Sequence, residues 1–280
     1  MEKRAPQVIR STVAGGDVSV RFWPGKGRPL VLLHGFLDSS EGWDNLCRHT
    51  HRPCYAFDLP GFGHSDIPSE ATFSAYGQRI ALAAQQLQIG PAIWVAHSMG
   101  GAVARAISDD PTLNNDIISL ALITPAGFGT VPLASVMDNV WLKPLVIGAF
   151  PLVSANPLST LLAYPSQISG GRRASGPLMW RTMKSALRGP QGPAMAAHAL
   201  STLNHLSPQD LYAPSAYAGP VASLWGEKDR LIPASHAAGV QAVYPQASVT
   251  LWEELAHHPQ AEQPRKLQSW IDHVAARSRR

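Results

Sequence analysis

The sequence predicts an α/β protein built on a mostly parallel sheet. Short apolar runs of strand length alternate with segments whose apolar residues recur at helical spacing, which is typical of strand–helix–strand units. One such run, residues 92–96, leads through a histidine into Ser98, and small residues and a helical pattern follow it. The 280 residues are 45% hydrophobic and 15% charged, a globular composition that can bury a sizeable core.

The amino-terminal third of the chain is expected to form a hairpin and two further strands. Residues 7–13 and 18–23 alternate apolar and polar side chains around Ala14-Gly15-Gly16-Asp17, which predicts the hairpin. Residues 29–33 form a continuous apolar run, as a strand buried in a parallel sheet requires. The elements expected next are a helical piece around residues 43–49 and a strand at 54–57.

A longer helix is expected before the strand that leads to Ser98. Thr72 or Ser74 can cap this helix, because apolar residues recur at helical spacing from Tyr76 to Leu87. Gly90-Pro91 then ends the helical pattern immediately before the next strand. The elements expected after Ser98 are a helix, a strand at 117–123, a strand at 221–225, a helix near 234–243, a strand at 249–252 and a final helix at about 263–276.

Residues 128–215 depart from this alternation, because Pro and Gly break them into several helical stretches. We therefore expect two domains, a core of residues 1–127 and 216–280 and a helical cap of residues 128–215 inserted after the sixth strand. The cap carries +4 of formal charge, from six basic residues and the acids Asp138 and Asp210. The basic residues are Lys143, Arg172, Arg173, Arg181, Lys184 and Arg188.

The charge of the cap has two interpretations. It is either an ordinary solvated helical face or a docking surface for an acidic partner or an anionic substrate tail. Nucleic-acid binding is not expected, because no basic stripe is interleaved with aromatic residues. The sequence does not indicate an oligomeric state.

Composition and apolar patterning indicate a cytoplasmic protein. The two cysteines, Cys47 and Cys54, fit a reducing compartment better than a disulfide scaffold. Residues 1–16 contain no apolar stretch of the kind that a secretory signal needs. The most apolar window, residues 141–164, contains Lys143 and several prolines, so no membrane span is expected.

Ser98 is the candidate nucleophile. A sharp turn between a strand and a helix can present a serine hydroxyl at the edge of a sheet, and small neighbouring residues let the two elements approach closely. The alternative is an ordinary helix N-cap, a position that Ser favours. A nucleophilic serine requires a base, an acid that orients the base, and donors for an oxyanion.

Ser98, Asp229 and His257 follow one another in the chain order nucleophile, acid, base. On these residues and their strand–turn–helix context the chain resembles the α/β-hydrolase family, over everything except the inserted cap. Ala96 stands where the family usually has Gly, and Ala is small enough to keep the turn. The resemblance implies a serine hydrolase that acts through an acyl-enzyme.

The acid is expected to be Asp229, which follows the predicted strand 222–225 in a Gly-x-x-Asp turn. It would orient the catalytic imidazole and stabilise the imidazolium. Glu227 is the nearest alternative carboxylate, and a plain helix cap is the structural alternative for Asp229. The strand ending at Ile123 is followed by no carboxylate, which removes the other place where the family keeps its acid.

Two adjacent histidines, His257 and His258, are candidates for the base. The segment from Ala256 resembles the family ending small-His-x-Pro-x-x-Glu-x-Pro, and alignment on Pro259 and Glu262 gives His257 the catalytic position. His258 then takes a position that an aromatic residue often holds. His97, beside the nucleophile, is expected to pack against the sheet, and His34 is likewise expected to be structural.

The resemblance assigns the oxyanion hole to the backbone N–H groups of Phe36 and Met99. Their side chains would line the acyl pocket, together with apolar cap residues such as Leu142, Phe150 and Leu161. The Asp58-x-Pro-Gly-x-Gly-x-Ser turn of the family is expected to be structural. No metal or cofactor is expected, because the histidines are scattered and Gly61-Phe62-Gly63 lacks the context of a dinucleotide fingerprint.

The predicted function is hydrolysis of a hydrophobic carboxylic ester. The serine at the turn argues against haloalkane dehalogenases and epoxide hydrolases, which use an Asp there. Hydrolases of carbon–carbon bonds in ring-cleavage products keep Ser, Asp and His, but usually carry Asn and Trp where this chain has His97 and His258. A thioesterase, a cofactor-free haloperoxidase, an esterase of acyl groups carried on an acidic carrier protein, and a non-enzymatic receptor or scaffold remain as alternatives.

Overall fold

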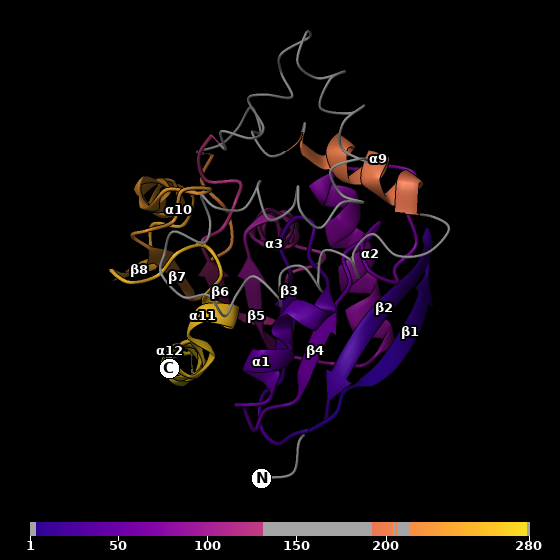
Figure 1. Ribbon diagram of the computed structural model, residues 1–280, viewed down its shortest axis with the longest axis horizontal. Helices are drawn as coiled ribbons and strands as arrows, with labels where there is room; N and C mark the ends of the chain where they lie inside the picture. The colour runs from indigo at the N-terminus through magenta and orange to yellow at the C-terminus, as the bar shows by residue number, and fades with distance from the viewer. Residues whose placement is uncertain (1–3, 131–191, 204, 206–212, 279–280) are drawn as a thin grey trace, which may run out of the picture.

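A computed structural model describes residues 4–130, 192–203, 205 and 213–278. In this part of the chain eight strands form one sheet in the order β1-β2-β4-β3-β5-β6-β7-β8, with helices on both faces (Figure 1). The strands are β1 (Gln7–Val13), β2 (Gly16–Trp23), β3 (Leu30–Leu33), β4 (Cys54–Phe57), β5 (Ala92–His97), β6 (Ile117–Ile123), β7 (Val221–Gly226) and β8 (Ser248–Trp252). The predicted fold class is confirmed.

The sheet is antiparallel at one edge and parallel elsewhere. The β1–β2 and β2–β4 pairs are antiparallel, whereas the pairs from β4–β3 through β7–β8 are parallel. Every residue of β3, β5 and β7 is buried, which explains why these strands are continuous apolar runs in the sequence. Strand order reverses between β3 and β5, so a crevice is expected at the carboxyl ends of these two strands.

Helices connect the strands and cover the sheet in this part of the chain. They are η1 (Ser40–Trp43), α1 (Asp44–Cys47), α2 (Phe73–Gln86), α3 (Met99–Asp109), α9 (Gly192–Leu203), η2 (Ala234–His236), α10 (Ala237–Val243), α11 (Pro259–Glu262) and α12 (Pro264–Arg277). Thr72 caps α2, because its side-chain oxygen accepts the N–H of Ala75, so the first of the two predicted caps is confirmed. The sequence did not predict α11, a short turn of helix with Pro259 at its start.

Two apolar cores lie on opposite faces of the sheet. On one face α2, α3 and α10 pack against the strands through side chains such as Ile80, Val103 and Val240. On the other face α1 and α12 do so through side chains such as Leu46 and Ile271. This three-layer arrangement holds the carboxyl ends of the central strands rigidly, which suits them to carry a functional site.

Most of the predicted cap, residues 131–191, lies outside the described residues. Leu142, Phe150 and Leu161 fall there, as do all six basic residues of the cap, so their expected roles and the domain boundaries stay predictions. The described portion includes α9, which lies close to α2 (Figure 1). Its Thr202 hydroxyl lies 3.8 Å from the sulfur of Met99, the first residue of α3.

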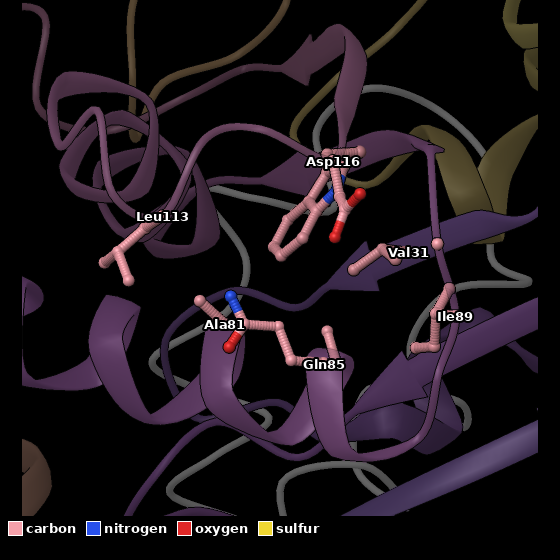
Figure 2. A pocket seen from close by; sticks show the side chains of 9 residues that line it. Val31, Ala81, Gln85, Ile89, Leu113 and Asp116 are labelled. Atoms are coloured by element: carbon pink, nitrogen blue, oxygen red, sulfur yellow. The ribbon is translucent and has the colours of Figure 1, made fainter.

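A small cavity lies between α2 and the amino-terminal part of the central strands (Figure 2). Val31, Ala81, Gln85 and Asp116 are among its lining residues, and its volume of about 10 Å³ suits roughly one water molecule. It lies at the end of the sheet opposite to Ser98, so it takes no part in the site described below. Among the described residues, no helix combines the length and the apolarity that crossing a bilayer requires.

Candidate active site

Ser98 occupies a sharp turn between β5 and α3. Its backbone has φ 52° and ψ −121°, a conformation that non-glycine residues rarely adopt. Three hydrogen bonds maintain it: the Ser98 N–H donates to the Ile123 carbonyl at 3.0 Å, and the Ser98 carbonyl accepts the N–H groups of Gly101 and Ala126. The strained turn that the sequence predicted is therefore present, and the Ser98 side chain does not cap the helix that follows.

Small residues around Ser98 allow the turn to pack closely. A Cβ at Gly100 would lie 2.6 Å from the carbonyl oxygen of Leu33, the last residue of β3. A Cβ at Gly101 would lie 2.4 Å from the Cβ of Pro125, and one at Gly35 would lie 3.1 Å from the Cβ of Ser98 itself. Gly100 and Gly101 therefore leave no room for a side chain, and Gly35 has little.

His257 links Ser98 to Asp229. Its Nε2 lies 3.0 Å from Ser98 Oγ, and its Nδ1 lies 2.7 Å from Asp229 Oδ2. The carboxylate can only accept a hydrogen bond, so Nδ1 carries the proton and Nε2 is left to accept a hydrogen bond from the Ser98 hydroxyl. All three residues are buried, with 8% or less of each exposed. The structure therefore brings the three predicted residues into one hydrogen-bonded chain.

Asp229 stands in the turn after β7, and its carboxylate is fully engaged. Oδ2 accepts from His257, while Oδ1 accepts the N–H groups of Leu231 and Ile232 at 2.8 and 3.0 Å. Burial by itself would raise the pKa of Asp229, but the interaction with His257 and the two backbone donors outweigh it and lower the pKa below its ordinary value. The group is therefore an anion at neutral pH.

The alternative acid and base take no part in this hydrogen-bonded chain. Glu227, the second candidate acid, is exposed to solvent. His258, the second candidate base, is buried, and its Nε2 has no hydrogen-bond partner within the described residues. Burial lowers the pKa of His258 to about 3, with the neighbouring charge of His257 as the next cause, so its ring stays neutral at neutral pH. Neither alternative contacts Ser98 through a hydrogen bond between described atoms.

Glu262 has a role that sequence reasoning missed. Its two carboxylate oxygens accept the N–H groups of Ala256 at 3.2 Å and His258 at 3.0 Å, the residues on either side of His257. In the sequence Glu262 served only to align the family ending. The spacing of Glu262 from the histidines was the available signal, since a carboxylate on a following helical turn can reach back to preceding N–H groups.

Two further histidines are buried near the site. His34 accepts the N–H of Leu59 at Nε2, at 2.9 Å, and its Nδ1 contacts the Gly35 carbonyl. Burial lowers the pKa of His34, so it is a neutral group that ties the loop after β3 to the chain after β4. His97 does more than pack against the sheet, because its Nε2 lies 2.7 Å from the carbonyl oxygen of His257.

The two predicted oxyanion donors belong to segments beside Ser98. Met99 is the first residue of α3, so its N–H belongs to the group of helix-start donors that have no partner within the helix. Phe36 follows Gly35, which packs against Ser98. The side chains of these two residues differ in exposure, because Met99 is fully buried in the core and Phe36 is partly exposed. The Phe36 ring centroid lies 6.3 Å from that of Phe62.

Within the described ranges, no group of three or more His, Cys, Asp or Glu side chains is arranged to hold a metal ion. The sulfurs of Cys47 and Cys54 are buried free thiols far from the chain of Ser98, His257 and Asp229, on the α1 side of the sheet.

Comparisons with known proteins agree with this architecture. Residues 28–264 match the model of the alpha/beta hydrolase fold family. Lipase 1 of Psychrobacter immobilis is 25% identical, over 90% of this chain and 78% of its own length. The pimeloyl-[acyl-carrier protein] methyl ester esterase of Cronobacter sakazakii is 28% identical, over 85% of this chain and 88% of its own length. Several other curated relatives are longer, and the chain spans 40% to 61% of their lengths.

Solved structures show the same fold. A thermophilic esterase from Thermogutta terrifontis superimposes with a TM-score of 0.71 at 23% identity, covering 97% of this chain and 99% of that one. At this identity the likeness concerns the fold alone. The family match is independent of it and extends over most of the chain, including Ser98, Asp229 and His257. The chain belongs to the α/β-hydrolase fold family.

Proposed function

We propose that this α/β-hydrolase cleaves carboxylic esters through an acyl-enzyme intermediate. The observation that carries the proposal is the hydrogen-bonded chain from Ser98 through His257 to Asp229. Each member lies at the carboxyl end of a parallel strand or in the loop after one, and together they have the donor and acceptor pattern that nucleophilic catalysis by serine needs. The esterase and lipase relatives support the same class of reaction.

In the proposed first half-reaction, Ser98 Oγ attacks the ester carbonyl carbon while His257 Nε2 takes the hydroxyl proton. The carbonyl oxygen becomes an oxyanion, which the backbone N–H groups of Met99 and Phe36 stabilise. When the tetrahedral intermediate collapses, the bond to the leaving alkoxide breaks, and that oxygen receives the proton from His257. The acyl group is then bonded to Ser98.

The second half-reaction repeats these steps with water as the nucleophile. His257 takes a proton from the water as its oxygen bonds to the acyl carbon, and returns the proton to Ser98 Oγ as the acid leaves. Asp229 keeps Nδ1 protonated throughout, so that Nε2 faces Ser98 as an acceptor, and its negative charge stabilises the imidazolium. Because three hydrogen bonds hold the carboxylate, it needs no reorganisation during turnover.

A second candidate is the hydrolysis of an ester whose acyl group is carried on an acidic carrier protein. Two observations favour it: the basic charge of the predicted cap, and the name of the Cronobacter sakazakii relative, which specifies an acyl-carrier-linked methyl ester. This candidate keeps the same three residues and the same acyl-enzyme, and changes only what the cap recognises. The acyl group is expected to be hydrophobic in either case, because residues 141–164 are rich in Leu, Ile and Val.

Labelling with a fluorophosphonate tests the nucleophile. Attack by Ser98 Oγ on phosphorus expels fluoride and leaves a stable adduct, which mass spectrometry locates on the peptide. We expect the intact protein to be labelled and Ser98→Ala not to be. Ser119→Ala is the matched control, because Ser119 is also fully buried, on the neighbouring strand β6, and should leave labelling unchanged. A folded protein that resists the label would instead support a receptor or scaffold.

The bond that is cleaved is tested with a panel of substrates. p-Nitrophenyl esters of increasing acyl length, an acyl thioester and a ring-cleavage dienoate should be compared by kcat/KM. The proposal expects the oxygen esters to be the best substrates, with kcat/KM rising as the acyl chain lengthens. A preference for the dienoate or for the thioester would move the chain to one of the other hydrolase classes.

A further inference from the structure

His97, the residue immediately before the candidate nucleophile, makes a direct contact with the main chain of the candidate base. Its Nε2 lies 2.7 Å from the His257 carbonyl oxygen, although 160 positions separate the two residues in sequence. A carbonyl oxygen only accepts, so His97 must carry its proton on Nε2. The two rings lie beside each other, with centroids 4.8 Å apart.

Gln260 contacts the other nitrogen of the His97 ring. Its side-chain Nε2 lies 3.1 Å from His97 Nδ1, and an amide NH₂ donates. His97 therefore accepts at Nδ1 and donates at Nε2, which is the neutral ring in a single tautomer. Burial, and after it the nearby charges of His257 and His258, keep the pKa of His97 well below its ordinary range, so this state persists at neutral pH. Both residues are at most 2% exposed.

The loop that carries His257 depends on such side-chain contacts. It connects β8 to α11, outside the sheet ladder, so its peptide groups need other partners. Glu262 accepts the N–H groups on either side of His257, and His97 donates to the carbonyl of His257 itself. These contacts engage N–H and carbonyl groups of three consecutive residues and so fix the backbone from which the imidazole projects.

We propose that His97 and Gln260 are positioning residues that hold the main chain of His257 in register with Ser98. Because His97 and Ser98 are consecutive, one dipeptide contacts the base twice, at its carbonyl through His97 and at its imidazole through Ser98. Gln260 keeps His97 in the donating tautomer. This inference deepens the proposed function and rests on it, since it concerns how the base is aligned for attack by Ser98.

Substitution of His97 tests the proposal. His97→Phe keeps a flat ring but removes the donor, whereas the amide of His97→Gln can reach the position of Nε2 and donate to the same carbonyl. We expect His97→Phe to lower kcat on p-nitrophenyl butyrate by about 10- to 100-fold with KM little changed. A loss of this size is typical when a reacting group is displaced by a fraction of an ångström to about one ångström. His97→Gln should recover most of that loss. Equal losses in the two variants, or no loss in His97→Phe, would overturn the proposal.

A second variant guards against failure of His97→Phe to fold. Gln260→Leu has a similar size and leaves His97 Nδ1 without a donor, so the ring loses one of the two hydrogen bonds that hold it against the His257 carbonyl. The same selective loss in kcat is expected, with the thermal midpoint measured alongside. A folded Gln260→Leu protein with kcat equal to that of the unaltered chain would contradict the role of Gln260.

A spectroscopic readout separates this proposal from the proposed function. The proton between His257 Nδ1 and Asp229 should give a far-downfield proton NMR resonance, which requires no turnover. We expect this resonance in the unaltered protein and in His97→Gln, and its broadening or loss in His97→Phe. If the protein fails to hydrolyse esters, the proposed function fails, while the resonance still decides whether His97 positions His257. An unchanged resonance in His97→Phe would overturn the inference.

Discussion

Asp229 accepts three hydrogen bonds, two from its own turn and one from the candidate base. The Leu231 and Ile232 N–H groups hold Oδ1 within its own turn, and His257 binds Oδ2. Contacts within its own turn thus set the position of the carboxylate independently of His257. The acid can therefore orient His257 rather than follow it, which is the property that a catalytic carboxylate needs.

Replacing Asp229 with Asn should keep the shape of the turn and change the tautomer of His257. The Asn side chain can keep its oxygen on the Leu231 and Ile232 N–H groups, so its NH₂ group faces His257 Nδ1 and forces the proton onto Nε2. We expect Asp229→Asn to lower kcat on p-nitrophenyl butyrate by about three to four orders of magnitude. Steady-state kinetics measure this effect.

Glu227→Gln is the matched control for that experiment, because Glu227 belongs to the same turn but is exposed. It removes one negative charge close to the site without altering the hydrogen bonds of His257. Its kcat should stay close to that of the unaltered protein. A loss in Glu227→Gln equal to that in Asp229→Asn would point to a general charge effect and against an orienting role for Asp229.

Single residues differ in how far the sequence could predict them. Ser98 and Asp229 stand at strand ends within local patterns, and the structure brings both to His257. The choice between His257 and His258 depended on alignment with a family ending, because adjacent histidines have the same local pattern. The contact of Glu262 with the base loop is local, and its spacing from the histidines was the available signal. The contact of His97 with His257 joins residues 160 positions apart, so no local pattern encodes it.

Helix α3 begins against the end of strand β3, and glycine makes this possible. Gly100 stands in the first turn of α3, where a Cβ would lie 2.6 Å from the Leu33 carbonyl oxygen and 2.8 Å from that of His34. These carbonyl oxygens belong to the backbone and cannot move aside as the end of a flexible side chain can. The spacing between α3 and β3 therefore fixes the start of α3, and with it the N–H of Met99.

Gly100→Ala should destabilise the protein by about 1–3 kcal/mol, because it overpacks a contact between two backbones. It should also lower kcat, since displacement of α3 moves the Met99 N–H. Urea unfolding and ester hydrolysis measure the two effects.

Gly77→Ala provides the comparison, in the middle of α2. The new Cβ would meet the Ile107 side chain at 2.9 Å, and that side chain can shift. Better helix propensity, worth about 1 kcal/mol, offsets the contact. Gly77→Ala should therefore cost clearly less than Gly100→Ala. Equal stability of Gly100→Ala and the unaltered protein would contradict the proposed close approach.

Elements were predictable where burial and periodicity are strong. The bounds expected for β1, β4 and β6 coincide with those in the structure. The start of the last helical region was predicted less well, because α11 is one short turn whose four residues lack a periodic apolar face. Its start is set by Pro259, and Glu262 at its end accepts N–H groups of the preceding loop.

At the scale of the whole molecule, the described cap helix α9 rests on the core close to the candidate site. His198 contacts the Tyr76 hydroxyl through a hydrogen bond, and its ring lies 6.4 Å from that of Phe62. Phe62 in turn lies beside Phe36, the second predicted oxyanion residue. Phe62 thus connects α9 to the loop whose N–H is proposed to hold the oxyanion.

The basic charge of the cap yields a prediction about substrate class. If an acidic carrier protein docks on the cap, Arg172, Arg173 and Arg181 changed together to Glu should lower kcat/KM for a carrier-bound methyl ester far more than for p-nitrophenyl butyrate. The difference should shrink at high salt, because exposed charges are screened over about 10 Å at 0.1 M ionic strength. Kinetics on both substrates over a salt series measure it.

The matched control reverses three exposed arginines on the core, Arg10, Arg265 and Arg277, which lie outside the cap. It changes the net charge of the protein by the same amount. If it impairs the carrier-bound ester as much as the cap variant does, the effect belongs to overall charge. Equal losses on both substrates in the cap variant would also contradict a docking surface.

The long sequence separations within the candidate site have a consequence for folding. Ser98 and His257 are 159 positions apart, and Asp229 is 28 positions from His257, so the site closes only after β5, β7 and β8 have all joined the sheet. The entropy of closing such loops is lost before the contacts form, which places these contacts late in assembly. A nascent chain that ends before β8 can build the serine turn but has no base. Ester hydrolysis would therefore report completion of the sheet, because the serine of a partly folded chain has no base to take its proton.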